Sequence, residues 1–303
     1  TCLVKPILSD HNQRNIKETE TINVDVDTKG IFLVTISART RNEKQVGGTD
    51  DEDLRIEIDG KKFSSLTNQQ RYFDSPAAFS GGTSKGVTKT VYFILWMDTG
   101  PHYIALIPDI STFLVNLDIF QISTENKLSR FVFPAKALAE DGDRRDWLTF
   151  VLLDASLDSF IADLILKRRF LDSDDVKVII DDVVMKQNQN NRQKLWYFVA
   201  SLFTGENQSD EFNVAMPVST HYVEFWADRT PRLENITFTN LAFKIPATIQ
   251  EKIEYRAKQY GFEPTMMLRL VKRESQFDPT ATSYADAKGL FQLTDITVKQ
   301  IKK

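Results

Sequence analysis

Several sequence features that mark particular classes of protein are rare or absent in this chain. It contains one cysteine, Cys2, so no disulfide can form within it. Glycine and proline are modest at 12 and 10 residues, and no tract is low in complexity. No apolar run approaches the length that spans a bilayer, and no signal-peptide segment is visible. The net charge of −4 is small and has no basic stripe, so nothing indicates a nucleic-acid partner.

The start of the chain, Thr1-Cys2-Leu3-Val4, has no initiator methionine, and we interpret it as a processed or trimmed terminus. Cys2 is a candidate lipid-bearing residue of a lipoprotein, an alternative that the sequence leaves open. A length of 303 residues predicts two or three domains, and an apolar content of 42% is enough to form a core. Phenylalanine is unusually frequent, at 21 residues.

Blocks of sequence recur in the same order along the chain. Residues 53–60 parallel 175–182, and residues 89–93 parallel 194–198. The third block aligns without a gap, from His102-Tyr103-Ile104 to Ile119 on one side and from His221-Tyr222-Val223 to Phe238 on the other. A weaker pairing sets 21–26 plus 31–36 against 147–153 plus 160–166. We predict two copies of one module.

The repeated blocks have the pattern of β-strands. Leu54, Ile56 and Ile58 alternate with charged residues, which places one face in a core and the other in water. Short apolar runs separated by turn residues favour an antiparallel sandwich or jelly roll. The predicted organisation is an N-terminal segment (1–20), module 1 (21–123), a charged linker (124–146), module 2 (147–245) and a helical region (246–303).

The strand order and the ending Gly-x-His-Tyr-x₅-Asp, whose His-Tyr-x₅-Asp part occurs in both copies, loosely resemble carbohydrate-binding sandwiches of glycan-active enzymes. Such modules stack exposed aromatic rings on sugars, and Trp96, Trp196 and Trp226 are the candidates. Each lies in or beside a strand block, which favours ordinary core packing.

Two histidines, His102 and His221, share one repeat position. We find no His, Cys or acidic partner at ligand spacing for either, so we expect buried imidazoles that satisfy turn carbonyls, and no metal site. The paired Asp109 and Asp228 are expected to be turn or capping carboxylates.

Beyond Pro246 helices replace strands. Residues Thr248 and Glu251 form a capping box, and Gly261 provides a left-handed exit from the helix that follows. Pro264 begins a second helix, which its apolar residues predict to be largely buried. These apolar residues are Met266, Met267, Leu268, Leu270 and Val271.

Glu274 stands in the last turn of this second helix. Apolar neighbours and the negative end of the helix dipole both disfavour an anion, so we expect this carboxyl to hold its proton near neutral pH. A glycosidic general acid has this property. The alternative is an exposed glutamate, flanked by Lys272 and Arg273, on a solvated helix end.

The residues around Glu274 form a dense motif: a helix ending in Glu-Ser, a polar loop with Phe and Pro, and a glycine-hinged Gly-Leu-Phe-Gln-Leu turn. Its members are Glu274, Ser275, Phe277, Pro279, Ala281, Ser283, Ala287, Gly289, Leu290, Gln292, Leu293 and Thr297. This motif resembles the catalytic core of the soluble lytic transglycosylase (SLT, lysozyme-like) family. The resemblance covers residues 246–303, about the last fifth of the chain.

The resemblance implies a multidomain protein, with two tandem all-β modules followed by the N-terminal helical part of an α lysozyme-like domain. It implies an enzyme, a lytic transglycosylase, that cleaves peptidoglycan glycan strands in the cell envelope or outside the cell. Glu274 would be the single acid and base, giving 1,6-anhydro-muropeptides, and no cofactor or metal is needed. Ser275, Gln292 and Phe291 would line the substrate cleft.

Three departures qualify the resemblance. Asp286 stands where the family usually has glycine, and Phe291 replaces the common methionine. The chain also ends before such a domain would be complete, so we expect these residues alone to be inactive. A hydrolytic muramidase stays possible. So do a structural or adhesive envelope or virion protein with a vestigial tail, and a pair of glycan-binding modules.

Overall fold

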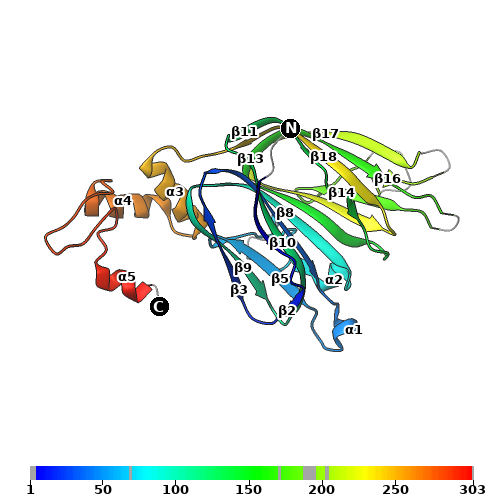
Figure 1. Cartoon of the computed structure of the whole chain (residues 1–303), viewed down its shortest axis with the longest axis horizontal. Coiled ribbons are helices and arrows are strands. Elements are labelled where there is room, and N and C mark those ends of the chain that lie inside the picture. Colours follow the sequence, from blue (N-terminus) through cyan, green and yellow to red (C-terminus); the bar gives the residue numbers. More distant parts are fainter. Residues whose placement is uncertain (1–4, 68–69, 170–171, 187–195, 202–204, 302–303) are drawn as a thin grey trace. The chain divides into compact units, whose positions relative to one another are not determined.

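The computed structural model describes residues 5–67, 70–169, 172–186, 196–201 and 205–301. The chain divides into two compact units, unit 1 (Thr1–Lys244) and unit 2 (Ile245–Lys303). Unit 1 is built mainly of β-strands, whereas unit 2 contains three helices among its described residues (Figure 1). Cys2 lies outside the described part of the chain.

The described residues of the first half of unit 1 form ten strands and two short helices. They are β1 (Lys5–Asp10), β2 (Arg14–Ile16), β3 (Glu20–Val26), β4 (Gly30–Arg39), α1 (Glu43–Val46), β5 (Asp53–Ile58), β6 (Lys61–Lys62), β7 (Phe79–Ser80), α2 (Gly81–Ser84), β8 (Thr88–Met97), β9 (Gly100–Pro108) and β10 (Thr112–Ser123).

The second half of unit 1 contains eight strands in the described residues, two of which are much longer than the others. They are β11 (Lys127–Phe133), β12 (Ala137–Leu138), β13 (Arg145–Ile165), β14 (Asp175–Ile180), β15 (Val183–Val184), β16 (Phe198–Val199), β17 (Asn207–Asp228) and β18 (Arg232–Phe243).

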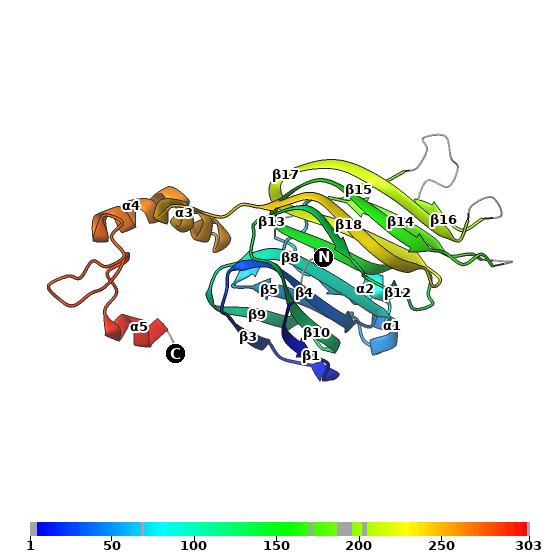
Figure 2. The same ribbon diagram turned by 45° about the horizontal axis from the view of Figure 1, so that its top comes forward.

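Strand pairing joins both halves of unit 1 into one large sheet. Its main path runs β1-β10-β4-β8-β13-β17-β14-β15, and a smaller sheet has the order β3-β9-β5-β6 with β7 beside β5. The pairing of β8 with β13 is parallel, and it links the first half to the second (Figure 2). The other pairings among the described strands are antiparallel.

The two halves repeat the same pattern of neighbours. In the first, β5 lies between β9 and the short β6 and β7, and in the second β14 lies between β17 and the short β15 and β16. The order β10-β4-β8 of the first half recurs as β18-β13-β17 in the second. The predicted parallel of 21–26 and 31–36 with 147–153 and 160–166 corresponds to β3 and β4 against the two halves of β13. The pairing pattern runs parallel to the sequence blocks, and two copies of one module stays a prediction.

One predicted block of the repeat is placed differently by the strand pairing. Phe198 lies opposite Val176 of β14, as Phe79 lies opposite Leu54 of β5. The equivalent of β16 is therefore the short β7, and the alignment of residues 89–93 with 194–198 is wrong. Short apolar runs with one aromatic residue look alike in sequence, whether they form central or edge strands. Residues 194 and 195 lie outside the described residues.

The predicted N-terminal segment and linker both contain strands. Residues 1–20 contribute β1, β2 and the first residue of β3, and residues 124–146 contribute β11, β12 and the start of β13. Within the sheets, β11 lies beside β18 as β1 lies beside β10. Where each module begins and ends along the chain stays a prediction.

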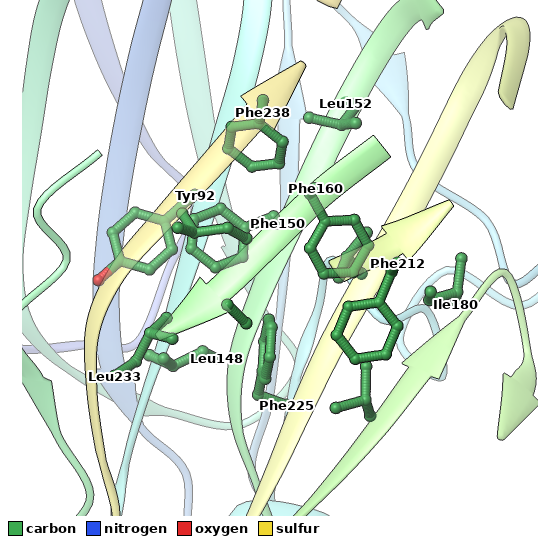
Figure 3. Packing of buried hydrophobic residues seen from close by; sticks show 14 of the residues in the cluster. Tyr92, Leu148, Phe150, Leu152, Phe160, Ile180, Phe212, Phe225, Leu233 and Phe238 are labelled. Carbon is green, nitrogen blue, oxygen red and sulfur yellow. The ribbon is translucent and has the colours of Figure 1, made fainter. Parts of the chain in front are cut away.

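Two apolar cores fill unit 1, on opposite faces of the large sheet. Val91 and Phe93 of β8 point into the core shared with the smaller sheet, whereas Tyr92 and Ile94 point into the core of the second half. The second core is rich in aromatic rings, such as Tyr92 stacked on Phe150 at 4.6 Å between centroids (Figure 3). This packing accounts for the high phenylalanine content.

The histidine at the repeated position makes the same interactions in both halves. His102 Nδ1 lies 2.6 Å from Asp59 Oδ2, and its Nε2 lies 2.8 Å from the Asp98 carbonyl. His221 Nδ1 lies 2.7 Å from Asp181 Oδ2, and its Nε2 lies 2.6 Å from the Pro217 carbonyl. The carbonyl contact was predicted, whereas the aspartate partners, which lie 43 and 40 positions away in sequence, were not.

Candidate active site

Two capped helices build the framework of unit 2. α3 (Ile249–Gln259) begins with the predicted capping box, because Thr248 Oγ1 accepts from the Glu251 amide and the Glu251 carboxylate accepts from the Thr248 amide. α4 (Pro264–Ser275) starts at the predicted proline. Its N-cap, Glu263, accepts from the Met266 amide at 2.7 Å, and hydrogen bonds from Thr265 and Met266 lower the pKa of Glu263.

Glu274 occupies the last turn of α4, as predicted, and is exposed. Its neighbours Lys272 and Arg273 are exposed too. Val271 is buried, but Met266 and Leu270 remain 52% and 42% exposed. The prediction that α4 is largely buried is wrong, because the described residues of unit 2 do not cover Met266 and Leu270. The described residues of unit 2 therefore form no apolar wall that shields Glu274 from water.

Ser275 connects the end of α4 to the glycine-hinged turn. The side chain is 8% exposed, and its hydroxyl oxygen lies 3.2 Å from the Val271 carbonyl and 3.0 Å from the Leu290 carbonyl. The residue after Glu274 is thus held against the turn at Leu290. This contact fixes where the backbone of Glu274 stands relative to the turn.

The side chain of Gln292 links two parts of the turn by hydrogen bonds. Its amide nitrogen donates to the carbonyls of Ala281 at 2.9 Å and Gly289 at 2.8 Å. The Gly289 amide donates to the same Ala281 carbonyl at 2.9 Å. Gly289 has φ +75°, a left-handed conformation that glycine adopts without steric cost.

The backbone conformation of Asp286 accounts for its departure from the family pattern. It lies in an exposed turn with φ +58°, the backbone region where glycine is usual and where Asp and Asn are tolerated best among other residues. Its amide donates to the Ser283 carbonyl at 3.0 Å. Asp286 therefore lies in a surface turn, as expected.

Phe291 faces a different part of unit 2 from Ser275 and Gln292. It lines an apolar cavity of about 370 Å³ with residues of α3, α4 and the segments beside them. The side chains that give this cavity its apolar character are Ile249, Ile253, Ala257, Tyr260, Phe262, Met267, Leu290 and Phe291. Ser275 and Gln292 therefore each bond to carbonyls of the turn after α4, while Phe291 packs toward α3.

The last described element, α5 (Asp295–Ile301), follows Thr294. The described residues include no group of three or more His, Cys, Asp or Glu side chains placed to bind a metal ion. Among those residues, none of the helices combines the length and apolar character needed to cross a membrane.

Known proteins resemble the chain chiefly in this helical region. Residues 251–303 match the family "Transglycosylase SLT domain". The SLT match is confined to unit 2. It agrees with the resemblance inferred from the motif around Glu274.

Curated relatives match over short stretches of the chain. Membrane-bound lytic murein transglycosylase C of Actinobacillus pleuropneumoniae serotype 5b is 38% identical over 78 residues, which are 23% of this chain and 21% of the relative. Membrane-bound lytic murein transglycosylase F of Desulfosudis oleivorans is 41% identical over 49 residues, 16% of this chain and 11% of the relative. The chain thus spans about a fifth or less of the length of these relatives.

Solved structures align along most of the chain but only loosely. The CBM22-1–CBM22-2 tandem domain of Paenibacillus barcinonensis Xyn10C covers 78% of this chain and 98% of its own, with 8% identity and a TM-score of 0.25. A score of this size does not define a shared fold.

Proposed function

We propose that this chain belongs to a peptidoglycan lytic transglycosylase of the cell envelope, with Glu274 as its acid and base. The observation that carries the proposal is the SLT match over residues 251–303, together with the position of Glu274 at the end of α4. The names of the matched relatives, lytic murein transglycosylases, support peptidoglycan as the substrate.

In the proposed reaction Glu274 acts twice. Its carboxyl donates a proton to the oxygen that joins N-acetylmuramic acid to N-acetylglucosamine, and the bond from this oxygen to C1 of the muramoyl sugar breaks. The carboxylate then takes the proton of the muramoyl C6 hydroxyl, whose oxygen bonds to C1. The product is a 1,6-anhydro ring, the carboxyl regains its proton, and no water is consumed.

The residues around Glu274 have positioning roles in this proposal. Ser275 is buried and bonded to the Leu290 carbonyl, so it orients the last turn of α4 and not the sugar directly. The Gln292 amide is bonded to two carbonyls of the turn, which keeps the cleft side of Gly289–Leu293 in one shape. Phe291 packs toward α3, and its proposed contact with the sugar stays a prediction.

The strand-rich unit 1 is proposed to bind glycan or to place unit 2 on its substrate. Two copies of a β-module ahead of the SLT region support this role, since the modules need not carry the reaction themselves. The structural or adhesive alternative assigns no chemistry to Glu274, so one variant separates the two proposals.

The experiment is a cleavage assay on purified sacculi with the intact protein that carries these residues. We expect Glu274→Gln to lower the release of anhydro-muropeptides by about 10²-fold or more, because general acid–base catalysis is lost. Glu254→Gln, a glutamate of α3 outside the motif, is the matched control and is expected to keep the wild-type rate. Release that is unchanged in Glu274→Gln would eliminate Glu274 as the acid.

A further inference from the structure

Unit 1 contains a cavity of about 310 Å³ that the proposed chemistry of unit 2 does not use. Its floor is the large sheet at β13, β14 and β17, and its rim is the segment from Phe73 to Thr83, which includes β7 and α2. This volume is at the lower end of the ~300–1,000 Å³ that ligand pockets occupy. The cavity lies wholly within unit 1.

The floor presents a row of side chains from neighbouring strands. Asp146 of β13 lies opposite Trp226 of β17, and Lys177 of β14 lies opposite Trp226 on its other side. Glu224 is two residues from Trp226 and so projects from the same face of the sheet. Trp226 Nε1 donates to Glu224 Oε2 at 3.0 Å.

Buried polar groups give this cavity the character of a prepared site. Asp146 is 4% exposed, and its Oδ2 forms an ion pair with the ammonium group of Lys89, which is 1% exposed. Lys89 also donates to the carbonyls of Pro76 at 2.8 Å and Ala78 at 2.6 Å, which holds the rim segment to the floor. The other oxygen, Asp146 Oδ1, is buried without a hydrogen-bond partner. Such a group is costly unless something satisfies it.

The charges of the cavity favour a neutral ligand. Lys89 offsets the charge of Asp146, and Lys177 lies over the Trp226 ring at 4.0 Å from its centroid. Burial, followed by repulsion from Asp146, raises the pKa of Glu224 to about 7, so this carboxyl can be a donor as well as an acceptor. The remaining carboxylates, Asp74 and Asp182, are exposed to solvent. A cation would therefore gain little here.

The remaining lining suits a polyhydroxylated molecule. Ser80 and Thr83 contribute hydroxyl groups, and the half-buried Phe73 and Trp226 contribute apolar aromatic surface. Ligands with hydroxyl groups on a ring of C–H groups need this combination of convergent hydrogen-bonding groups and aromatic surface.

We propose that this cavity binds one or two rings of a neutral glycan, with Glu224 as a hydrogen-bonding group and Trp226 as the apolar wall. The inference extends the glycan-binding role proposed for unit 1, and it does not depend on Glu274.

The test is calorimetric titration of the 303-residue chain carrying Glu274→Gln, so that binding is measured without cleavage. The probes are three neutral trisaccharides: triacetylchitotriose, cellotriose and maltotriose. We expect at least one of them to bind with a Kd of about 1 mM or tighter. Trp226→Ala is expected to weaken that binding by about tenfold or more.

Trp96→Ala is the matched control. Trp96 is half-buried like Trp226, and its indole nitrogen also donates to an acid two residues away, Asp98 at 3.1 Å, but it lies outside the cavity. Thr83→Tyr, which fills the cavity from its rim and leaves the floor intact, covers the case in which Trp226→Ala fails to fold. It too should weaken binding about tenfold, whereas Trp96→Ala should not.

The inference is overturned if none of the three trisaccharides binds, or if Thr83→Tyr and Trp226→Ala bind as tightly as Trp96→Ala. Cleavage by the intact protein is a separate result. If Glu274→Gln still cleaves sacculi, the proposed catalysis is contradicted and the proposed glycan site is not. If the cavity variants bind normally, the proposed glycan site is contradicted and the proposed catalysis is not.

Discussion

Carboxyl groups begin the equivalent strands β5 and β14, and both are poorly solvated. Burial raises the pKa of Asp53 to about 7, and repulsion from Asp51 and Asp109 adds to it. Burial likewise raises the pKa of Asp175 to about 7, with repulsion from Asp228 next. The two strands therefore share an electrostatic arrangement as well as a pattern of neighbours.

The raised pKa values predict how stability depends on pH. Between about pH 4 and pH 7 the folded chain keeps a proton on Asp175 that the unfolded chain has lost, so the free energy of unfolding falls as pH rises through this window. Asp175→Asn removes the contribution of Asp175 to this dependence and leaves that of Asp53. Relative to wild type, the variant should gain on the order of 1 kcal/mol between pH 5 and pH 8, after solvent screening is allowed for.

Urea unfolding at the two pH values measures this gain. Asp25→Asn, an exposed strand aspartate on β3, is the control and should show no gain. A gain for Asp175→Asn that is equal at pH 5 and pH 8 would contradict the assignment.

The buried ammonium group of Lys89 supports a second prediction. Lys89→Met leaves Asp146 without its ion partner and frees the Pro76 and Ala78 carbonyls, so we expect a loss of about 3–5 kcal/mol in the free energy of unfolding. The double variant Lys89→Met/Asp146→Asn should recover part of this loss. Equal losses in the single and double variants, measured by urea unfolding, would show that the ion pair has no such role.

Contacts between side chains on different strands were the hardest to predict. The alignment of the repeat paired Asp59 with Asp181 and His102 with His221, but did not join each aspartate to its histidine. The two residues of each pair are 43 and 40 positions apart, and their contact depends on a strand register that no local pattern shows. Asp146 and Glu224 were missed for the same reason. The available signal was a glutamate inside the apolar run Tyr222–Trp226.

Elements with a local stop or start signal were predicted well. Thr248, Glu251 and Pro264 begin α3 and α4 where the sequence placed them, and β5 and β14 share the alternating burial of their predicted strands. β11 was predicted as part of a linker because residues 124–146 are rich in charge and contain Pro134 and Gly142. Of its seven residues only Phe131 is fully buried, and an edge strand of this kind lacks a clear period-two signal.

The capping box gives a prediction for unit 2. Thr248→Ala removes the acceptor for the Glu251 amide and should lower the stability of α3 by about 1 kcal/mol. The effect is read from the thermal melt of helical circular dichroism. Thr248→Ser, which keeps the hydroxyl acceptor, is the control and should stay close to wild type. A melt of Thr248→Ala that matches that of Thr248→Ser would contradict the capping role.

At the scale of the whole molecule, the parallel pairing of β8 with β13 was beyond the reach of sequence patterns. The repeat indicated two modules in tandem, but not that their strands continue one sheet. The core on each face of β8 explains why its strand reads as almost wholly apolar. In unit 2, the exposed Glu274, Met266 and Leu270 differ from the buried helix expected, because burial depends on residues far from α4 in sequence.

The central claim is that Glu274 closes an anhydro ring without using water. The most direct measurement is mass spectrometry of muropeptides that the intact protein releases from sacculi in water enriched in heavy oxygen. We predict products that lack one water and contain no heavy oxygen, and none of these products from Glu274→Gln. Products that carry heavy oxygen at the muramoyl C1, or unchanged release from Glu274→Gln, would contradict the account.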